Sequence, residues 1–170
     1  MSDLVLQRYE SPEGTLMLGS FEERLCMCDW ENSPLHRRNL MRIEKGIDCQ
    51  SIVGTSQVIA TAKEQLDAYF AGDLKQFDIP LLFIGTDFQK QVWESLLRIP
   101  YGATSTYGEQ AQRMGRPKAV RAIARANGSN AISIIVPCHR IVGRNGKLTG
   151  YAGGIEAKRN LLNHEFLHSS

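Results

Sequence analysis

The sequence IIVPCHRIVG, residues 134–143, contains the buried and reactive side chains around which the rest of the chain is arranged. Its apolar, β-branched start, together with Ile132, predicts a short buried strand. Pro137 ends that strand, because proline cannot donate a hydrogen bond to a sheet ladder. An extended chain would point Cys138 and His139 to opposite faces. A turn or one coil of helix after Pro137 lets both side chains approach one pocket.

A thiol beside an imidazole is the smallest side-chain set that makes a nucleophilic cysteine. Free cysteine is mostly protonated at neutral pH, and a positioned base or cation raises the thiolate fraction. For an isolated pair, a buried structural cysteine next to a solvent-facing histidine is the commoner arrangement. The surrounding sequence therefore has to show whether Cys138 is a nucleophile or a structural cysteine. After the pair, Ile141 and Val142 form a second β-branched run that leads to a tight turn at 145–146.

The composition is that of a globular protein. The 170 residues can bury a substantial core, as one domain or two small ones. The sequence shows neither a long apolar run nor a basic-then-apolar leader, so we expect a cytoplasmic protein with no membrane segment. Four cysteines are too few for a disulfide scaffold and fit a reducing compartment.

The net charge of +2 hides an asymmetry between the two halves of the chain. Residues 1–84 hold 8 Lys/Arg and 13 Asp/Glu, whereas residues 85–170 hold 12 and 5. Between Glu109 and Glu156 there are 8 basic residues and no acidic one. Positive charge gathered around the cysteine indicates a polyanionic partner, and a merely solvated basic face rarely excludes acids over so long a span.

The acidic first half predicts a mixed α/β domain. Turn signals separate three expected strands, and the helix that follows has Thr55 or Ser56 as its cap and Gly72 as its stop. The expected elements are strands at 3–9, 15–20 and 25–30, a possible basic helix at 35–45, a helix from about 57 to 71, and an extended linker at 73–84.

Cys26 and Cys28 lie two apart in the third expected strand, on one face, with His36 downstream. This spacing raises the possibility of a zinc site. Zinc clusters normally offer four clearly spaced ligands, and a fourth is not evident here. We therefore expect ordinary strand cysteines and no metal.

The second half predicts a helix-turn-helix. Two capping boxes, at 86–89 and 106–109, open a helix that ends before 100–102 and a short helix that ends near Met114. A tight turn at 115–117 leads to a third helix over 118–127. Its expected inward stripe is Val120, Ile123, Ala124 and Asn127, and its expected outward stripe is Lys118, Arg121, Ala122 and Arg125. Alanines between the charges make the outward face slim enough for close approach to DNA.

The last predicted helix, about 155–164, follows a glycine-rich loop at 150–154. Leu161 and Leu162 mark its buried face, and Glu165 continues that face one turn on. Acids are seldom buried without a partner, so a core-facing Glu165 is a candidate to hold the imidazole of His139. A frayed helix end with Glu165 in water is the alternative.

Together these features resemble the methylated-DNA–protein-cysteine methyltransferases, also called O6-alkylguanine-DNA alkyltransferases, and in particular their bacterial Ogt-like branch. The resemblance is strong from about 86 to 166 and weak before that. The matching stretches are Phe88-Gln89 through Val92-Trp93, Ile99-Pro100-Tyr101-Gly102, Thr106-Tyr107-Gly108, Arg121, Ala126-Asn127-Gly128-Ser129-Asn130, Val136-Pro137-Cys138-His139-Arg140, Gly150-Tyr151-Ala152-Gly153-Gly154, Leu161-Leu162 and His164-Glu165.

The resemblance implies an α/β (α+β) protein with a ribonuclease H-like domain over residues 1–84. A helical, winged-helix-like DNA-binding domain with a helix-turn-helix would cover residues 85–170. The implied activity is DNA repair by a methyltransferase that moves the alkyl group of O6-alkylguanine, and of O4-alkylthymine, irreversibly to its own Cys138. The implied partner is double-stranded DNA, entered from the minor groove with base flipping by a monomer that needs no cofactor.

The resemblance also implies residue roles. Cys138 would accept the alkyl group, His139 would be its base through a bound water, Glu165 would orient His139, and Asn130 would tie down the turn. Tyr107 would rotate a phosphate and contact the flipped base, and Arg121 would fill the gap left in the duplex. The guanine pocket would be lined by Tyr107, the backbone of Ile141, Tyr151 and Ala152. The DNA-binding residues would be Tyr107, Lys118, Ala119, Arg121, Ala122 and Arg125.

Two positions depart from the family pattern. Ala131 stands where proline usually follows the asparagine, which loosens the expected turn, and Gln110 stands where leucine is common. Two other classes of protein use part of the same residue set. A cysteine hydrolase would turn over repeatedly, and a DNA-binding regulator would leave Cys138 idle, so reaction stoichiometry separates the three.

Overall fold

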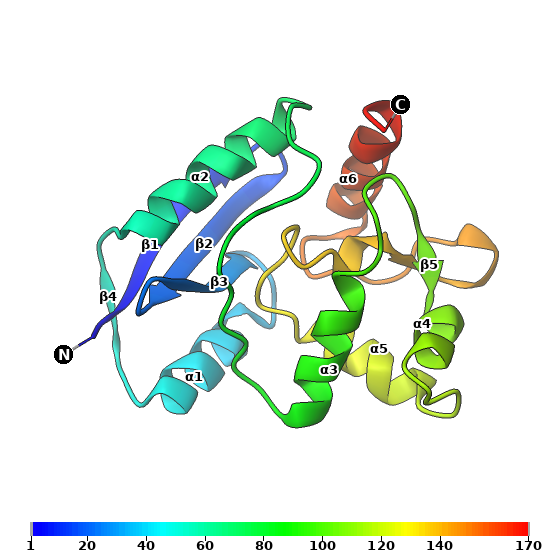
Figure 1. Ribbon diagram of the computed structural model, residues 1–170, viewed down its shortest axis with the longest axis horizontal. Helices are drawn as coiled ribbons and strands as arrows, with labels where there is room; N and C mark the ends of the chain where they lie inside the picture. Colours follow the sequence, from blue (N-terminus) through cyan, green and yellow to red (C-terminus); the bar gives the residue numbers. More distant parts are fainter. Residues whose placement is uncertain (1, 170) are drawn as a thin grey trace.

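A four-stranded sheet forms the N-terminal half of the protein in this computed structural model, which describes residues 2–169 (Figure 1). Its strands are β1 (Leu4–Ser11), β2 (Gly14–Phe21), β3 (Arg24–Trp30) and β4 (Ser51–Val53). The first three form an antiparallel meander, and β4 pairs in parallel with β1, so that the order is β3-β2-β1-β4. The three strands expected from the sequence are thereby confirmed.

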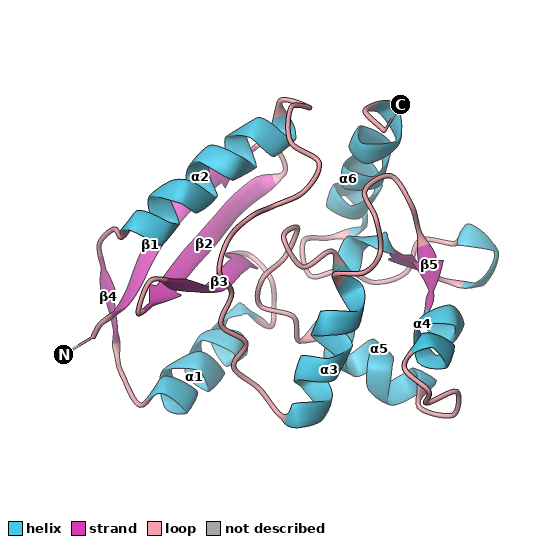
Figure 2. Ribbon diagram, viewed as in Figure 1, coloured by secondary structure: helices cyan, strands magenta, loops and turns pink. Residues whose placement is uncertain are grey.

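Two helices cover opposite faces of this sheet (Figure 2). Helix α2 (Gln57–Phe70) begins at Ser56, whose hydroxyl accepts a hydrogen bond from a first-turn backbone N–H, as expected for a capping residue. Its Ile59 and Leu66 pack into one hydrophobic cluster with the strands. Helix α1 (His36–Ile47) places Ile43 in a second cluster with the opposite side chains of β1. Because successive side chains of a strand point to opposite faces of the sheet, the two clusters lie on opposite sides of it.

The prediction that Cys26 and Cys28 share a face of the strand is wrong. A β-bulge between Gly19 and Ser20 shifts the register of β2 against β3. The extra residue turns Cys26 into the cluster with Ile43, while Cys28 lies in the other cluster. Both thiols are buried in the core, and burial raises both pKa values, that of Cys26 to about 12.

The linker between the halves is extended, as expected, and it is attached to the sheet. The backbone N–H of Leu25 donates to Pro80, and the N–H of Leu82 donates back to Leu25. Residues 80–82 therefore continue the sheet beyond β3 by one bridge. This pairing fixes where the second half of the chain begins.

Helices dominate the C-terminal half: α3 (Asp87–Leu96), α4 (Tyr107–Arg113), α5 (Val120–Gly128) and α6 (Ile155–Leu167). Both expected capping boxes are present, at Thr86 and at Thr106. Two-residue strands β5 (Ser105–Thr106) and β6 (Ile141–Val142) pair in parallel, with 3-10 turns η1 (Cys138–Arg140) and η2 (Arg144–Gly146) on either side of β6. None of the helices described within residues 2–169 is long and apolar enough to cross a membrane.

Several boundaries and faces differ from the sequence-based expectation. Helix α5 begins two residues later than expected, at Val120, and α6 continues three residues beyond His164. Leu97 is 46% exposed because α3 ends at Leu96 and the chain turns away. Val120 is also partly exposed, and Ala126 takes its place in the core.

The buried strand expected at Ile132–Val136 is not formed, although every residue of that run is buried. Only Ile132 pairs, through one bridge to Cys28 of β3. Ile134 has a φ of 70°, a left-handed conformation that reverses the chain and that β-branched residues rarely adopt. Tertiary contacts at both ends of the run therefore override its local preference for an extended strand.

Candidate active site and DNA-binding surface

Cys138 is the first residue of η1, so the turn predicted after Pro137 is confirmed. The side chain of Asn130 holds this turn closed. Its Nδ2 donates to the carbonyl of Val136 at 2.9 Å and lies 3.4 Å from the Cys138 Sγ. Its Oδ1 accepts the backbone N–H of Ile132 at 2.9 Å. One buried amide thus joins the two ends of the Ile132–Val136 run and contacts the thiol.

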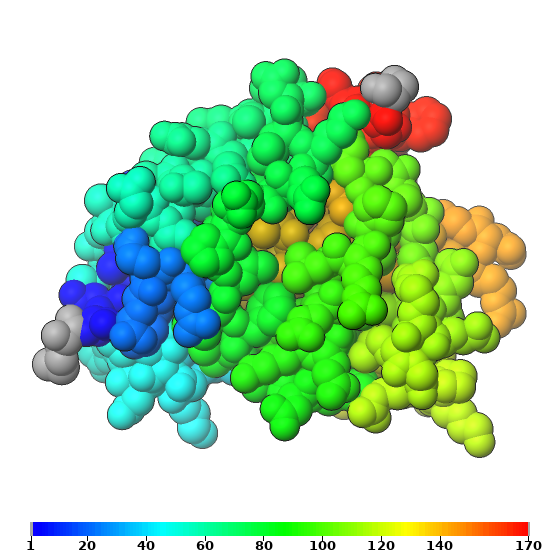
Figure 3. Space-filling model, viewed as in Figure 1, coloured from blue at the N-terminus to red at the C-terminus, as the bar shows by residue number. Residues whose placement is uncertain are grey.

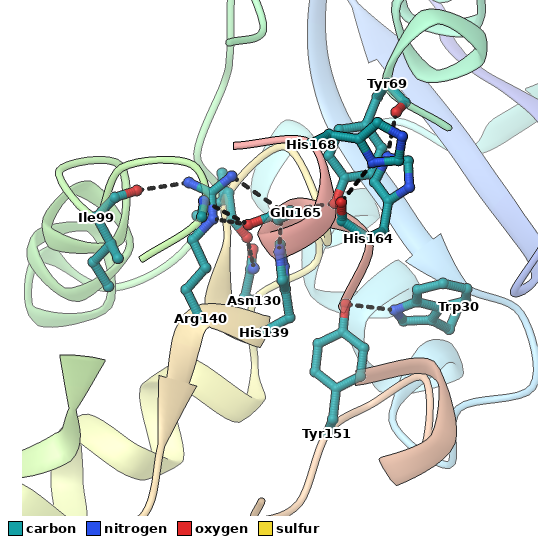
Figure 4. Close-up of polar contacts among 12 residues, drawn as sticks. Trp30, Tyr69, Ile99, Asn130, His139, Arg140, Tyr151, His164, Glu165 and His168 are labelled. Carbon is teal, nitrogen blue, oxygen red and sulfur yellow. Dashed lines mark hydrogen bonds and ion pairs between the residues drawn. The ribbon is translucent and has the colours of Figure 1, made fainter. Parts of the chain in front are cut away.

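His139, which follows Cys138 in η1, forms a buried pair with Glu165 of α6 (Figure 4). The His139 Nε2 lies 2.6 Å from the Glu165 Oε2, and the two side chains are 0% and 1% exposed. An ionised carboxylate only accepts hydrogen bonds, so His139 carries its proton on Nε2. The other ring nitrogen, Nδ1, is left as a buried acceptor with no partner among the residues that the structure describes.

Glu165 is held by four residues. Arg140 donates to both carboxylate oxygens, at 2.8 and 3.1 Å, and its third nitrogen donates to the carbonyl of Ile99 at 2.6 Å. The hydroxyl of Tyr69, from α2, donates at 2.7 Å, and the N–H of Gly102 lies at 3.4 Å. Burial alone raises the pKa of Glu165, but the hydrogen bonds from His139 and Arg140, together with the positive charge of Arg140, hold that pKa well below its usual range.

Burial keeps both reacting groups neutral in the resting protein. Burial, together with the positive charges of Arg140 and Lys158, lowers the pKa of His139 despite the opposing effect of Glu165, so the imidazole is a free base at neutral pH. Burial also raises the pKa of the Cys138 thiol, while the hydrogen bond from Asn130 and the positive charge of Lys158 partly oppose that rise. Lys158 is itself 1% exposed, with its Nζ 3.3 Å from the carbonyl of Thr149. The thiolate therefore needs a proton acceptor in order to form.

Cys138 opens onto a small pocket at the junction of α4, α5 and the glycine-rich loop. Tyr107 comes from the first residue of α4, and its hydroxyl lies 2.8 Å from the Thr149 Oγ1. The hydroxyl of Tyr151 accepts a hydrogen bond from the indole of Trp30 at 3.2 Å, which anchors the loop to β3 (Figure 4). The lining residues are Tyr107, Ala124, Asn127, Gly128, Asn130, Cys138, Gly150, Tyr151 and Ala152.

The outward face of α5 lies beside this pocket. Arg121, Ala122 and Arg125 are exposed on α5, as the helical spacing predicts, and Lys118 is exposed in the turn that precedes the helix. None of the three cations makes an ion pair within residues 2–169. Ala119 is the N-cap and is half-buried. The surface is thus positively charged and unneutralised next to the opening of the cysteine pocket.

Gln110, which stands where leucine is common in the family, is packed between three helices. Its amide exchanges two hydrogen bonds with Asn127 of α5, at 2.8 and 3.0 Å, and donates to the Ser95 hydroxyl of α3 at 3.0 Å. Gln110 is fully buried and Asn127 nearly so. Satisfied buried amides of this kind specify one packing arrangement. The three helices are therefore held in a fixed relation by this polar contact.

Comparison with known proteins gives the family. Residues 4–83 match the 6-O-methylguanine DNA methyltransferase, ribonuclease-like domain, and residues 87–166 match the 6-O-methylguanine DNA methyltransferase, DNA binding domain. The chain belongs to the 6-O-methylguanine DNA methyltransferase family. A relative named methylated-DNA–protein-cysteine methyltransferase, from Methanosarcina acetivorans, is 48% identical over 92% of this chain and 95% of its own.

Solved structures of the family share the whole fold. The crystal structure of Mycobacterium tuberculosis OGT in complex with DNA is 42% identical, covers 96% of this chain and 94% of its own, and has a TM-score of 0.82. The O6-methylguanine-DNA methyltransferase of the archaeon Pyrococcus kodakaraensis is 27% identical over 95% of this chain and 98% of its own, with a TM-score of 0.64. The expected two-part α/β fold and the family assignment are confirmed.

The structure places Asn130 against the Cys138 thiol and Glu165 against His139, the residue that follows Cys138. Ile141 is buried in β6 and is not among the residues that line the pocket. Within residues 2–169, no group of three or more His, Cys, Asp or Glu side chains is placed to hold a metal ion. His36 instead contacts Asp29, at 2.9 Å.

Three residues around the site escaped sequence reasoning. Lys158 lies three residues before Leu161 and seven before Glu165, so the helical stripe on α6 could have revealed that it is buried. Tyr69 lies three residues after the buried Leu66 on α2, so the helical spacing could have revealed that it is buried as well. For Arg140 the sequence offers no periodic signal, because it lies in a turn.

Proposed function

We propose that this protein repairs alkylated DNA by transferring the alkyl group of O6-alkylguanine to its own Cys138, once per molecule. The observation that carries the proposal is the set Cys138, His139 and Glu165, in which a thiol opens onto a pocket and an ionised carboxylate holds a neutral imidazole behind it. The exposed basic face of α5 lies beside the same pocket. The family relationship supports the same activity.

The transfer begins with loss of the thiol proton. The buried Nδ1 of His139 is the available base, and we place one water molecule between it and the Cys138 thiol. The imidazolium that forms is stabilised by Glu165, whose own charge is held by Arg140. Thiolate sulfur then attacks the alkyl carbon in line, the carbon–oxygen bond breaks, and its electron pair passes to the guanine. A proton from a donor in the pocket neutralises the purine as it leaves.

The product explains the single turnover. A thioether has no electrophilic carbonyl for water to attack, in contrast to the thioester of a cysteine hydrolase. The Cys138 alkyl group therefore stays in place, and the protein is consumed. O4-alkylthymine presents the same kind of alkyl–oxygen bond, so we include it as a second substrate.

DNA binding is assigned to the α4–α5 unit, with the base delivered from the minor groove. The target atom is hidden inside a duplex, so the nucleotide has to be flipped out, at a cost of a few kcal/mol. Tyr107 lines the pocket, and in this proposal it contacts both a phosphate and the flipped base. Arg121 projects from the adjacent face and would occupy the vacated stack, while Lys118 and Arg125 would contact phosphates, with Ala119 and Ala122 allowing close approach.

Two further statements complete the proposal: the protein acts as a monomer, and it acts in the cytoplasm. Cys26, Cys28, Cys49 and Cys138 are all free thiols, which fits a reducing compartment. Light scattering of the protein, alone and with a short duplex, tests the first statement. A stable dimer in both samples contradicts it.

Mass spectrometry tests the activity. Incubation with a duplex that contains one O6-methylguanine should add one methyl group per protein, on the peptide that contains Cys138, and then stop. Cys138→Ser is the matched control and should remain unmodified. Sustained turnover would indicate a hydrolase, no transfer would indicate a DNA-binding regulator, and a methyl group on Cys26, Cys28 or Cys49 would contradict the assignment of the acceptor.

A further inference from the structure

A second cleft lies between the linker and the turn after α3 and is separate from the cysteine pocket. It has a volume of about 540 Å³, within the usual range for small-molecule sites. Figure 3 shows the hollow, with atoms of the segment around residues 135–140 at its floor between two walls of earlier chain. The lining residues are Lys75, Gln76, Phe77, Ile79, Leu81, Leu97, Arg98, Ile99, Pro100, Tyr101, Ile135, Pro137 and Arg140. None of them lines the cysteine pocket.

The walls of this linker cleft are apolar. Phe77, Ile79 and Leu81 alternate along the extended linker, which puts their side chains on one side of it. Leu97 and Tyr101 face them from the turn after α3. The 46% exposure of Leu97 is therefore part of a lined cavity and not an isolated surface leucine. Such walls suit a flat hydrophobic or aromatic group.

The charge of the linker cleft has one sign. Lys75 and Arg98 are exposed on opposite walls, and Arg140 lies at the floor. No acidic side chain of the described chain lines the cleft, and neither Lys75 nor Arg98 makes an ion pair within it. An anion would pair with these two exposed cations.

We propose that the linker cleft binds a small aromatic anion, a ring system that carries a carboxylate or a phosphate. The ring packs between Phe77 and Leu97, and the anionic group lies between Lys75 and Arg98. An occupant also contacts Pro137, the residue before Cys138, so the site adjoins the back of the active-site turn without entering the pocket in front of it. A nucleoside monophosphate and an aryl carboxylate both have this chemistry.

Nuclear magnetic resonance titration of the full-length protein tests the site with two probes, 2-naphthoate and uridine monophosphate. At least one of them should bind with a dissociation constant of about 1 mM or tighter. The amide shifts should cluster at Phe77, Ile99 and Tyr101. Whichever probe binds identifies the source of the anion. Absence of binding by both, or shifts centred on Tyr107 and Tyr151, overturns the proposal.

Three variants sharpen the test. Lys75→Glu combined with Arg98→Glu should weaken binding by about tenfold or more, which corresponds to about 1.4 kcal/mol. Arg24→Glu makes the same kind of charge change at an exposed site outside the cleft and should change affinity less than about twofold. Ile79→Trp fills the cleft and should abolish binding. Equal affinities for the charge variant and the Arg24→Glu control, or full binding by Ile79→Trp, contradict the site.

Discussion

At the scale of single residues, Glu165 connects the parts of the active site. Its carboxylate receives hydrogen bonds from α2, from η1 and from the turn after α3, and it fixes the tautomer of His139. An acid buried so completely is stable only because Arg140 pairs with it in bidentate geometry. Glu165 therefore acts on the Cys138 thiol indirectly, because it stabilises the imidazolium that forms when His139 accepts the thiol proton.

Replacing Glu165 with glutamine should slow alkyl transfer by about tenfold to a hundredfold, because a neutral amide cannot stabilise the imidazolium. The pKa of Cys138 should rise further, while DNA affinity stays near the wild-type value. Thiol titration and single-turnover rates measure both effects. Tyr69→Phe is the matched control, since it removes one hydrogen bond to Glu165 and leaves its charge. An unchanged rate and pKa for Glu165→Gln would mean that Glu165 is only structural.

The neutral state of His139 also predicts a dependence of stability on pH. Its pKa is lowered by burial in the folded protein, despite Glu165 and with Arg140 and Lys158 opposing protonation as well. As pH falls through about 6.5, the unfolded chain takes up a proton at this position and the folded one does not, so folding becomes less favourable. His36 acts in the opposite direction, because its hydrogen bond to Asp29 raises its pKa.

Because His36 has the opposite effect, the contribution of His139 to the pH dependence of stability is obtained by comparing the wild type with a variant that lacks the His139 imidazole. Between pH 8 and pH 5 the wild type should lose more thermal stability than His139→Gln, whose amide can still donate to Glu165. Differential scanning calorimetry at matched ionic strength measures the loss of thermal stability in each protein. Equal losses in the two proteins would show that His139 titrates normally in the fold.

At the scale of elements, the α4–α5 unit depends on packing that leaves one face free. The capping box at Thr106 starts α4 next to the pocket, and the Gln110–Asn127 amide pair holds α5 against it. Ile123 and Ala126 bury the inner side of α5. The outer side is then the exposed basic face, in a fixed position relative to Cys138.

This geometry predicts different effects for the variants Arg121→Ala and Lys118→Ala. Arg121→Ala should reduce repair of duplex DNA much more than transfer from a free O6-alkylguanine base, because a free base needs no flipping. Lys118→Ala should instead weaken binding to all sequences and lower the salt dependence by about one unit of slope. Rates on both substrates and affinities at several salt concentrations provide the data. Equal losses on both substrates for Arg121→Ala refute the proposed role in flipping.

At the scale of the whole molecule, the N-terminal half supports the reaction without presenting the nucleophile. Tyr69 bonds Glu165, and Trp30 bonds Tyr151 in the pocket loop. The backbone of Cys28 exchanges hydrogen bonds with Ala131 and Ser133, at 2.8 Å each. The sheet therefore holds the back of the active-site turn, which also compensates for alanine at position 131.

Methylation of Cys138 should lower the stability of the whole protein. The thiol contacts Asn130, which closes the turn, and an added methyl group in a packed site costs about 1–3 kcal/mol. Loosening this turn should also weaken DNA binding through the end of α5. Thermal unfolding of the unmodified and fully methylated protein at one pH measures the effect. An equal or higher midpoint after methylation would show that the pocket accommodates the product.

Local sequence determined much of this protein by itself. Capping boxes, turn residues and periodic apolar stripes predicted most helices and the first three strands, because those signals act over a few neighbouring residues. The Cys138-His139 pair, the acid-free basic span and the stripe that leads to Glu165 indicated the chemistry. Each of these can be read without knowing what lies across the fold.

Tertiary structure alone decided the rest. Ile132–Val136 has the composition of a strand, yet the Asn130 amide and β3 bend it into a turn, because several buried hydrogen bonds outweigh a local preference. Burial of Glu165 depends on Arg140, 25 residues away, and on Tyr69, 96 residues away. The free-energy cost of burying a charge is offset only by partners that the fold brings together. Sequence spacing does not show which distant residues become those partners.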